Sequence, residues 1–407
     1  MKCLISVVLL HMFLFSGCGS DPDTSADASG DVLAPADASA EGDGLGSEAE
    51  TSDDVVMAQD DAGDVGDQGA VQDETRVDLG WDVSVDGPYQ AGHRTLEVTY
   101  PSVSLGADRT IEYHLWYPTE ATEGETVYYA EIFVDENVFG EAPLAPPAVG
   151  DHYPLHIHSH GNLGYAGSSP HLMRHFATHG WVVVAPSHKG NTIIDNLSPR
   201  PAWMYTVRSE DVSATLDALA VLPEADALAG KVDVSAALLS GHSYGAYTAL
   251  GLAGAAFNME QIPSVCAEDE SGECSDAVLG LFEAGVRDER LIASIPMAPG
   301  SYDMYAEGIS DIVIPTMHMT GSEDRPQANA DVWAALPAPA HRVHVEGGCH
   351  QLFALGGCEL IPDDPGLVIV NAYALAFGRH YLLEDQSVLS LLDGTEVLDE
   401  TVTLSTK

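Results

Sequence analysis

The chain has few basic side chains. Only 15 lysines and arginines stand against 63 aspartates and glutamates in 407 residues, which gives a formal net charge of −48. A field of this sign repels phosphate backbones and anionic headgroups, so we expect no nucleic-acid partner. Cysteine is scarce too: there are six, and none forms the C-x-x-C spacing typical of a structural zinc site. No internal repeat occurs, which argues against a solenoid or a propeller.

The first residues, MKCLISVVLLHMFLFSGC, are typical of an export signal. The apolar stretch 4–15 is too short to span a bilayer, and we assign a signal peptide to residues 1–17. FSGC resembles a bacterial lipobox, which implies lipidation of Cys18; a plain signal peptide with a chance cysteine is the alternative. Gly19, rather than aspartate, follows the cysteine. The resemblance therefore implies a protein anchored by lipid to the cell envelope, at the outer rather than the inner membrane.

A long acidic segment follows the signal. Between positions 19 and 86 there are 20 acidic residues and one basic residue. Such a composition buries too little apolar surface to offset the entropy of ordering, so we predict a disordered linker over residues 18–86. The spaced aspartates lack the ligand pattern of an EF-hand. Residues 87–407 keep 43 acidic and 13 basic side chains and should form one folded domain.

Four cysteines remain after the signal peptide and the lipidation site are set aside. In an exported protein, an even remainder at short spacing indicates disulfides, although other pairings are formally open. The short spacings favour the pairs Cys266–Cys274 and Cys349–Cys358. The second bridge would hold the loop that begins at position 350.

The domain alternates strand and helix patterns. Two half-buried strands joined by a turn come first, at 95–105 and 109–118, and apolar strands follow at 153–161, 181–187, 236–241, 291–300, 311–324 and 341–350. Helices are expected at 171–180, at 209–222 with Ser209 as its cap, and after position 243. This order predicts an α/β fold with a mostly parallel central sheet, antiparallel N-terminal strands and helices on both faces. For the C-terminal 21 residues, a strand and a helix are both open.

The stretch GHSYGAY, positions 241–247, lies between a buried strand and a helix. A G-x-S-x-G sequence in this context predicts a nucleophile elbow with Ser243 at its tip. The tight turn strains the backbone of the serine, and tiny residues are needed two positions away, here Gly241 and Gly245. The positive end of the following helix favours an anion at this place.

An acid and a base should follow Ser243 in that order along the chain. Asp324 comes at the end of one apolar strand and is our candidate acid, with Glu323 as the alternative. His350 comes at the end of the last apolar strand and is the candidate base, the alternative being a histidine that only packs beside the disulfide. Both positions lie at the carboxyl edge of the predicted sheet, where sites of such sheets are found.

An oxyanion site needs two backbone N–H donors, one of them from the residue after the nucleophile. That residue is Tyr244. The second donor should come from the glycine-rich turn HSHGNLG at 158–164, where we choose Asn162 and keep Gly161 as the alternative. These residues together predict a serine hydrolase that cleaves carboxylic esters through an acyl-enzyme intermediate.

The same residues resemble the α/β-hydrolase superfamily, and within it the branch of platelet-activating-factor acetylhydrolases and predicted dienelactone hydrolases. The resemblance covers residues 94–381 and includes GADRTIEYHLWYPTEA and FATHGWVVVAPSHKGNT. It implies carboxylic-ester hydrolysis without a cofactor. Dienelactone hydrolases use a cysteine nucleophile whereas this chain has Ser243, so that activity is not carried over. The elbow also continues with GA where GG is usual.

A metal-dependent hydrolase is the main alternative function. His156, His158 and His160 alternate along one strand and so share a face. A helical row, His171, His175 and His179, repeats every four residues and is expected to face solvent. No acidic partner and no H-E-x-x-H pattern accompanies either set.

A non-catalytic binding module on the same scaffold is the other alternative, since fold alone does not settle function. A transacylase with the same residues would look identical in sequence.

Residues 257–287, with the first cysteine pair, are expected to form a small cap over the site. We expect a monomer that acts on a small-molecule or lipid-like ester.

Overall fold

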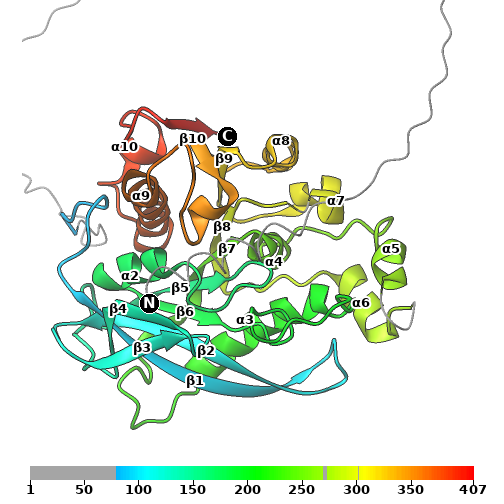
Figure 1. The fold of residues 1–407 in the computed structure, drawn as a ribbon, viewed down its shortest axis with the longest axis horizontal. Helices are drawn as coiled ribbons and strands as arrows, with labels where there is room; N and C mark the ends of the chain where they lie inside the picture. Colours follow the sequence, from blue (N-terminus) through cyan, green and yellow to red (C-terminus); the bar gives the residue numbers. More distant parts are fainter. Residues whose placement is uncertain (1–78, 269–272, 301) are drawn as a thin grey trace, which may run out of the picture. The chain divides into compact units, whose positions relative to one another are not determined.

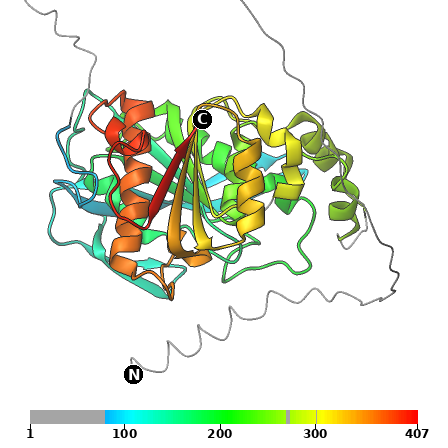
Figure 2. The ribbon, with the colours of Figure 1, turned by 90° about the horizontal axis from the view of Figure 1, so that it is seen from above.

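The computed structural model describes residues 79–268, 273–300 and 302–407, so the signal peptide, Cys18 and nearly all of the linker lie outside the described residues. Within the described part, eleven strands form one sheet, with helices on both faces (Figures 1 and 2). The strands are β1 (Gln90–Ser102), β2 (Ala107–Thr119), β3 (Glu125–Tyr129), β4 (Phe133–Gly140), β5 (Tyr153–Ser159), β6 (Val182–Pro186), β7 (Val232–His242), β8 (Leu291–Met297), β9 (Thr316–Glu323), β10 (Ala340–Cys349) and β11 (Val402–Thr406). The helices are α2 (Pro170–Thr178), α3 (Met204–Ala220), α4 (Tyr244–Leu252), α5 (Ile262–Ala267), α6 (Asp276–Ala284), α7 (Tyr302–Tyr305), α8 (Pro326–Ala335), α9 (Asp363–Leu383) and α10 (Leu389–Leu392), with 3₁₀ turns η1 (Ala306–Asp311) and η2 (His350–Phe353).

The strand order is β11-β10-β9-β8-β7-β5-β6-β2-β1-β4-β3. The central strands β6, β5, β7, β8, β9 and β10 pair in parallel. Antiparallel pairing occurs towards the edges, where β1 pairs with β2, β2 with β6, β3 with β4 and β10 with β11. The predicted α/β class, with a mostly parallel sheet and an antiparallel start, is confirmed.

Apolar side chains from both sheet faces form the core. On one face α2 and α9 pack on the sheet through residues such as Phe176 and Phe377, and Trp181, just before β6, belongs to the same cluster. On the other face α3 and α4 cover it, with Val212 and Leu252 in contact with strand residues. Helix α9 has the length and composition of a membrane span, but 67% of its apolar window is buried inside the domain, as in a core helix.

Helix α3 begins earlier than the sequence predicts. Ser209 was expected to cap this helix, but it lies inside it, five residues after Met204. Met204 and Val207 are fully buried, so the apolar face of the helix already starts there and tertiary packing extends it. The C-terminal segment contains both a short helix, α10, and the edge strand β11.

A segment before β1, residues 79–89, lies along α2 and the end of α9, and we call it the N-terminal strap. The folded part therefore starts before the predicted boundary at residue 87. The strap is held by hydrogen bonds from side chains to its backbone carbonyls: Arg379 to Trp81, His175 to Val83 and His179 to Val85, at 2.7, 2.9 and 2.9 Å.

The histidine row of α2 was predicted to face solvent, and this is wrong. His171, His175 and His179 are 7%, 3% and 1% exposed. Two of them contact the strap, while His171 bonds to Asn371 of α9 at 2.7 Å. The helical spacing correctly places them on one face, but that face is covered by chain from both ends of the domain.

Candidate active site

A sharp turn joins β7 to α4 at Ser243. Its backbone has φ +55° and ψ −112°, a left-handed conformation that side-chain-bearing residues rarely adopt. The turn leaves no room on either side. A Cβ at Gly241 would lie 2.1 Å from the carbonyl oxygen of Gly245, and one at Gly245 would lie 1.8 Å from that of Ser159. The strained serine and the two required glycines are the geometry of a nucleophile elbow.

Three side chains from three strand ends form a hydrogen-bonded row at this turn. Ser243 Oγ lies 2.8 Å from His350 Nε2, and His350 Nδ1 lies 2.9 Å from Asp324 Oδ1. Asp324 is 3% exposed in its side chain and His350 is 25% exposed. The histidine thus lies between an accessible hydroxyl and a buried carboxylate. The alternative acid, Glu323, is exposed and hydrogen-bonds to the neighbouring Ser322.

The buried carboxylate is stabilised in its charged form. Burial raises the pKa of Asp324, but the hydrogen bond and charge of His350, with the charge of Arg325, outweigh it and hold this pKa below its ordinary value. An ionised Asp324 that accepts the Nδ1 proton leaves Nε2 of His350 free to accept a proton from Ser243.

A second histidine, His242, packs against His350 and bonds to its backbone. His242 donates from Nε2 to the backbone carbonyl of His350 at 2.9 Å, and the two rings lie 4.7 Å apart. Burial, and then the nearby His350, lower the pKa of His242 to about 3. It therefore stays neutral and does not compete with His350 for a proton near pH 7.

The glycine-rich turn after β5 lies beside the nucleophile. A Cβ at Gly161 would be 3.4 Å from Ser243 Cβ, so the backbone of this turn borders the elbow directly. The side chain of the neighbouring Asn162 is fixed, because its Oδ1 accepts from Asn191 Nδ2 and Arg200 Nη2, both at 2.7 Å. The structure thus places Gly161, the alternative second donor, beside Ser243, and Asn162 follows it directly in the chain.

The predicted histidine strand contains buried polar contacts rather than an open site. His156 Nε2 and His158 Nδ1 both contact Ser240 Oγ, at 2.7 and 2.8 Å, and His160 Nε2 accepts from the backbone N–H of His188. Burial lowers the pKa of His156 to about 3. Among the described residues, no group of three or more His, Cys, Asp or Glu side chains is placed to hold a metal ion.

A buried polar cluster beneath the glycine-rich turn at 158–164 was not anticipated from the sequence. Arg208 of α3 is fully buried, and so are Ser159, His188 and Asp211, each 4% exposed or less. His188 Nδ1 bonds to Asp211 at 2.9 Å, and Asp211 also accepts from Arg109 Nε at 2.7 Å. Arg208 lies one residue before the helix predicted at 209–222, so no sequence pattern indicated its burial.

Both predicted cysteine pairs are at bonding distance. Cys266 of α5 is joined to Cys274, two residues before α6, and Cys349 and Cys358 bracket the 3₁₀ turn η2 that begins at His350. The predicted cap segment packs with Phe257 and Phe282 against Tyr247 of α4. A pocket of about 370 Å³ separates α6 from the tip of the β1–β2 hairpin at residues 103–106.

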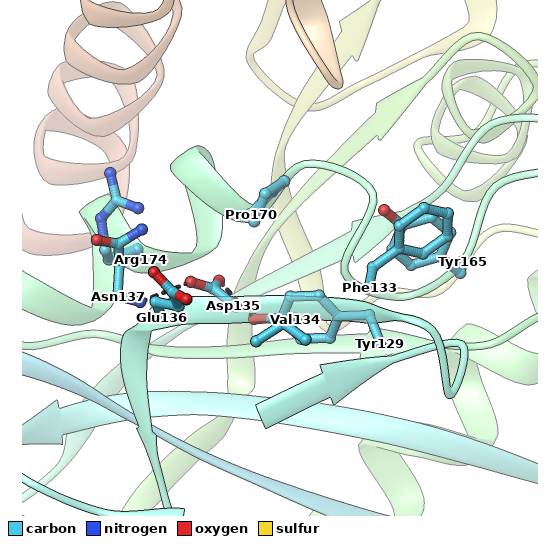
Figure 3. Close-up of a pocket in the computed structure, with 9 residues that line it drawn as sticks. All are labelled: Tyr129, Phe133, Val134, Asp135, Glu136, Asn137, Tyr165, Pro170 and Arg174. Atoms are coloured by element: carbon cyan, nitrogen blue, oxygen red, sulfur yellow. Dashed lines mark hydrogen bonds between the residues drawn. The ribbon is translucent and has the colours of Figure 1, made fainter. Parts of the chain in front are cut away.

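Another pocket, of about 380 Å³, is lined by the end of β3, by β4, by Tyr165 and by the start of α2 (Figure 3). Figure 3 shows the rings of Phe133 and Tyr165 at one end and the side chains of Asn137 and Arg174 at the other. The two rings are stacked at 4.8 Å. None of the three side chains in the hydrogen-bonded row lines this pocket.

Comparison with known proteins supports the fold. No protein-family model matches the chain, and no curated protein matches it. Among solved structures, it is similar to a ferulic acid esterase from Streptomyces cinnamoneus, with a TM-score of 0.54 and 17% sequence identity over 80% of this chain and 100% of that one. The sheet order, the elbow and this similarity show that the chain has an α/β-hydrolase fold.

Proposed function

We propose that the protein is a serine hydrolase of carboxylic esters. The observation that carries the proposal is the row Ser243–His350–Asp324, in which both hydrogen bonds are shorter than 3 Å, Asp324 is buried, and Ser243 and His350 are partly exposed. The narrower resemblance to platelet-activating-factor acetylhydrolases, and the esterase activity named for the structural neighbour, are consistent with this reaction class.

The reaction follows from the positions of these groups. Ser243 Oγ attacks the carbonyl carbon of the ester while His350 Nε2 takes its proton, and Asp324 stabilises the resulting imidazolium. The backbone N–H groups of Tyr244 and Asn162 stabilise the oxyanion that forms on the carbonyl oxygen. His350 then gives the proton to the departing alcohol, which leaves an acyl group on Ser243. Water, deprotonated by His350, attacks this acyl-enzyme and releases the acid.

Hydrolysis of p-nitrophenyl esters from acetate to long chains, in the presence of EDTA, tests the proposal. Ser243→Ala should lower kcat by at least about 10⁴-fold, since the residual rate comes from the oxyanion site and binding alone. Ser235→Ala, at the other end of β7 and hydrogen-bonded to Asp233, is the matched control and should keep wild-type activity. Activity that survives Ser243→Ala, or that requires added zinc, would contradict a serine mechanism.

We also propose that the enzyme acts outside the cytoplasm on a lipid tether at Cys18, which lies outside the described residues. The support is the FSGC sequence and the acidic segment that follows it. In a bacterial host that processes lipoproteins, labelled palmitate should be incorporated into the wild-type protein and not into Cys18→Ala. Equal labelling of both would refute the tether without bearing on the hydrolase.

A further inference from the structure

Arg208 is a buried cation without a carboxylate partner. Its side chain is fully buried, and none of the ion pairs within the described ranges includes it. All of its hydrogen-bond acceptors are neutral: Thr248 Oγ1 at 3.2 Å, Asn191 Oδ1 at 2.6 Å, Ser159 Oγ at 3.1 Å and the backbone carbonyl of His160. Burying a charge without a counter-charge costs folding free energy, which indicates a functional role for this guanidinium.

These acceptors belong to the segments that surround the oxyanion site. Ser159 and His160 end β5 and start the glycine-rich turn, and Thr248 lies one turn into α4. The guanidinium carbon also lies 4.5 Å from the ring centre of Tyr244, whose backbone N–H is the first proposed donor. A single side chain thus contacts both arms of the proposed oxyanion site.

The contact with the His160 carbonyl determines how the turn presents its N–H groups. A peptide unit is planar and trans, so its C=O and N–H point in opposite directions. When Arg208 holds the carbonyl of His160, it also fixes the direction of the Gly161 N–H. The next carbonyl, that of Gly161, is held by the N–H of Gly164 at 3.1 Å and by the ring of His160, which fixes the N–H of Asn162 in the same manner.

A buried chain of hydrogen bonds supports Arg208 itself. Because Arg208 can only donate and the Asp211 carboxylate can only accept, every hydrogen bond in the chain is donated in the same direction. Arg208 donates to Ser159 Oγ, Ser159 donates to His188 Nε2 at 2.9 Å, and His188 Nδ1 donates to Asp211 at 2.9 Å. This is a second Ser-His-Asp row, but its serine and histidine are fully buried and the serine already accepts from Arg208. It therefore links the arginine to a carboxylate at a distance, rather than acting on a substrate.

We propose that Arg208 is a positioning residue for the oxyanion site, which orients the backbone N–H of Gly161 beside the proposed donor Asn162 and keeps a positive charge beneath the ring of Tyr244. The proposal rests on the proposed esterase function. It predicts that loss of the guanidinium weakens binding of the transition state more than binding of the ester.

The test compares Arg208→Gln and Arg208→Lys with wild type on p-nitrophenyl acetate. For the glutamine variant, kcat should fall by about 10²-fold, the loss typical of one oxyanion donor, while KM changes by less than about threefold. The Kd of phenylboronic acid, which forms a tetrahedral anion on the serine, should rise by a similar factor. Lysine keeps the charge but not the forked donor geometry, so the kcat of Arg208→Lys should lie between those of wild type and Arg208→Gln.

Arg379→Gln is the matched control, because Arg379 is an equally buried arginine whose hydrogen bonds go to Trp81, Asp385 and Ser387, outside the candidate site. It should lower the melting temperature at least as much as Arg208→Gln while keeping kcat within about threefold of wild type. If Arg208→Gln does not fold, Thr248→Val, which removes one acceptor and keeps the charge, should still lower kcat and weaken boronate binding severalfold. An unchanged boronate Kd, or equal kcat losses in the Arg208 and Arg379 variants, would overturn the proposal. Activity retained by Ser243→Ala would instead indicate failure of the esterase assignment.

Discussion

The domain should lose stability in mild acid because it buries so many neutral histidines. Burial is the first cause in each of six pKa shifts, which are large. The pKa is lowered to about 3 for His93, His156, His242 and His318, and to about 4 for His171 and His179. In the unfolded chain each would titrate near its ordinary value of about 6.5. As the pH falls below that value, the unfolded state takes up protons that the native state does not bind.

The sign and size of the effect follow from these values. The stabilisation is fully present above about pH 6.5 and is lost as the pH falls towards about 4. Each histidine costs about 1.4 kcal/mol per pH unit within this window, so six cost about 8 kcal/mol per unit. Domains of this kind have a total stability of about 5–15 kcal/mol, so unfolding is expected between about pH 5.5 and 5. The aspartates with lowered pKa values, such as Asp288 and Asp324, lose their contributions at lower pH and do not overlap this window.

Urea unfolding of the purified protein, followed by tryptophan fluorescence from about pH 7.5 to about pH 5.5, measures this slope. His179→Gln keeps an N–H donor for the carbonyl of Val85 and should reduce the slope by about 1.4 kcal/mol per pH unit. His152→Gln, at an exposed position, is the control and should leave the slope unchanged. A wild-type slope below about 2 kcal/mol per unit, or equal slopes in both variants, would refute the reasoning.

Two further pairs of variants test the site and the turn. Asp324→Asn should lower kcat for p-nitrophenyl acetate by about 10⁴-fold, whereas Glu323→Gln should stay close to wild type; the reverse order would make Glu323 the acid. Gly245→Ala places a Cβ 1.8 Å from the carbonyl of Ser159, which cannot move cheaply, so urea unfolding should show a loss of more than about 3 kcal/mol. The Cβ of Gly280→Ala in α6 would meet nothing within 4 Å, so this variant should instead raise the free energy of unfolding by about 0.5–1 kcal/mol. Destabilisation by both alanines would contradict the steric argument.

The sequence locates the candidate site because each of its parts follows a recognisable strand. Ser243, Asp324 and His350 come directly after apolar runs, and parallel strands bring their carboxyl ends to one edge of the sheet. The two glycines that flank the serine can be predicted in the same way, since the tight turn requires them. These features depend on local pattern and on the general geometry of parallel sheets.

The buried polar contacts could not be predicted in this way. Arg208 precedes the helix predicted at 209–222 by one residue, and the neutral acceptors that make its burial tolerable come from three distant segments. The row His171, His175 and His179 was misassigned for the same reason. Periodicity establishes that side chains share a face, whereas what covers that face depends on tertiary packing.

The N-terminal strap has a mechanical consequence for a chain that is pulled from its N-terminal side. Tension applied ahead of residue 79 reaches the carbonyls of Trp81, Val83 and Val85 first, and their bonds to Arg379, His175 and His179 carry the load. These contacts connect to α2 and α9, the two helices on one face of the sheet, so the force is shared across the molecule before it reaches β1. For a protein anchored at Cys18, as proposed above, the strap would take up a pulling force before that force reaches the strands that hold Ser243.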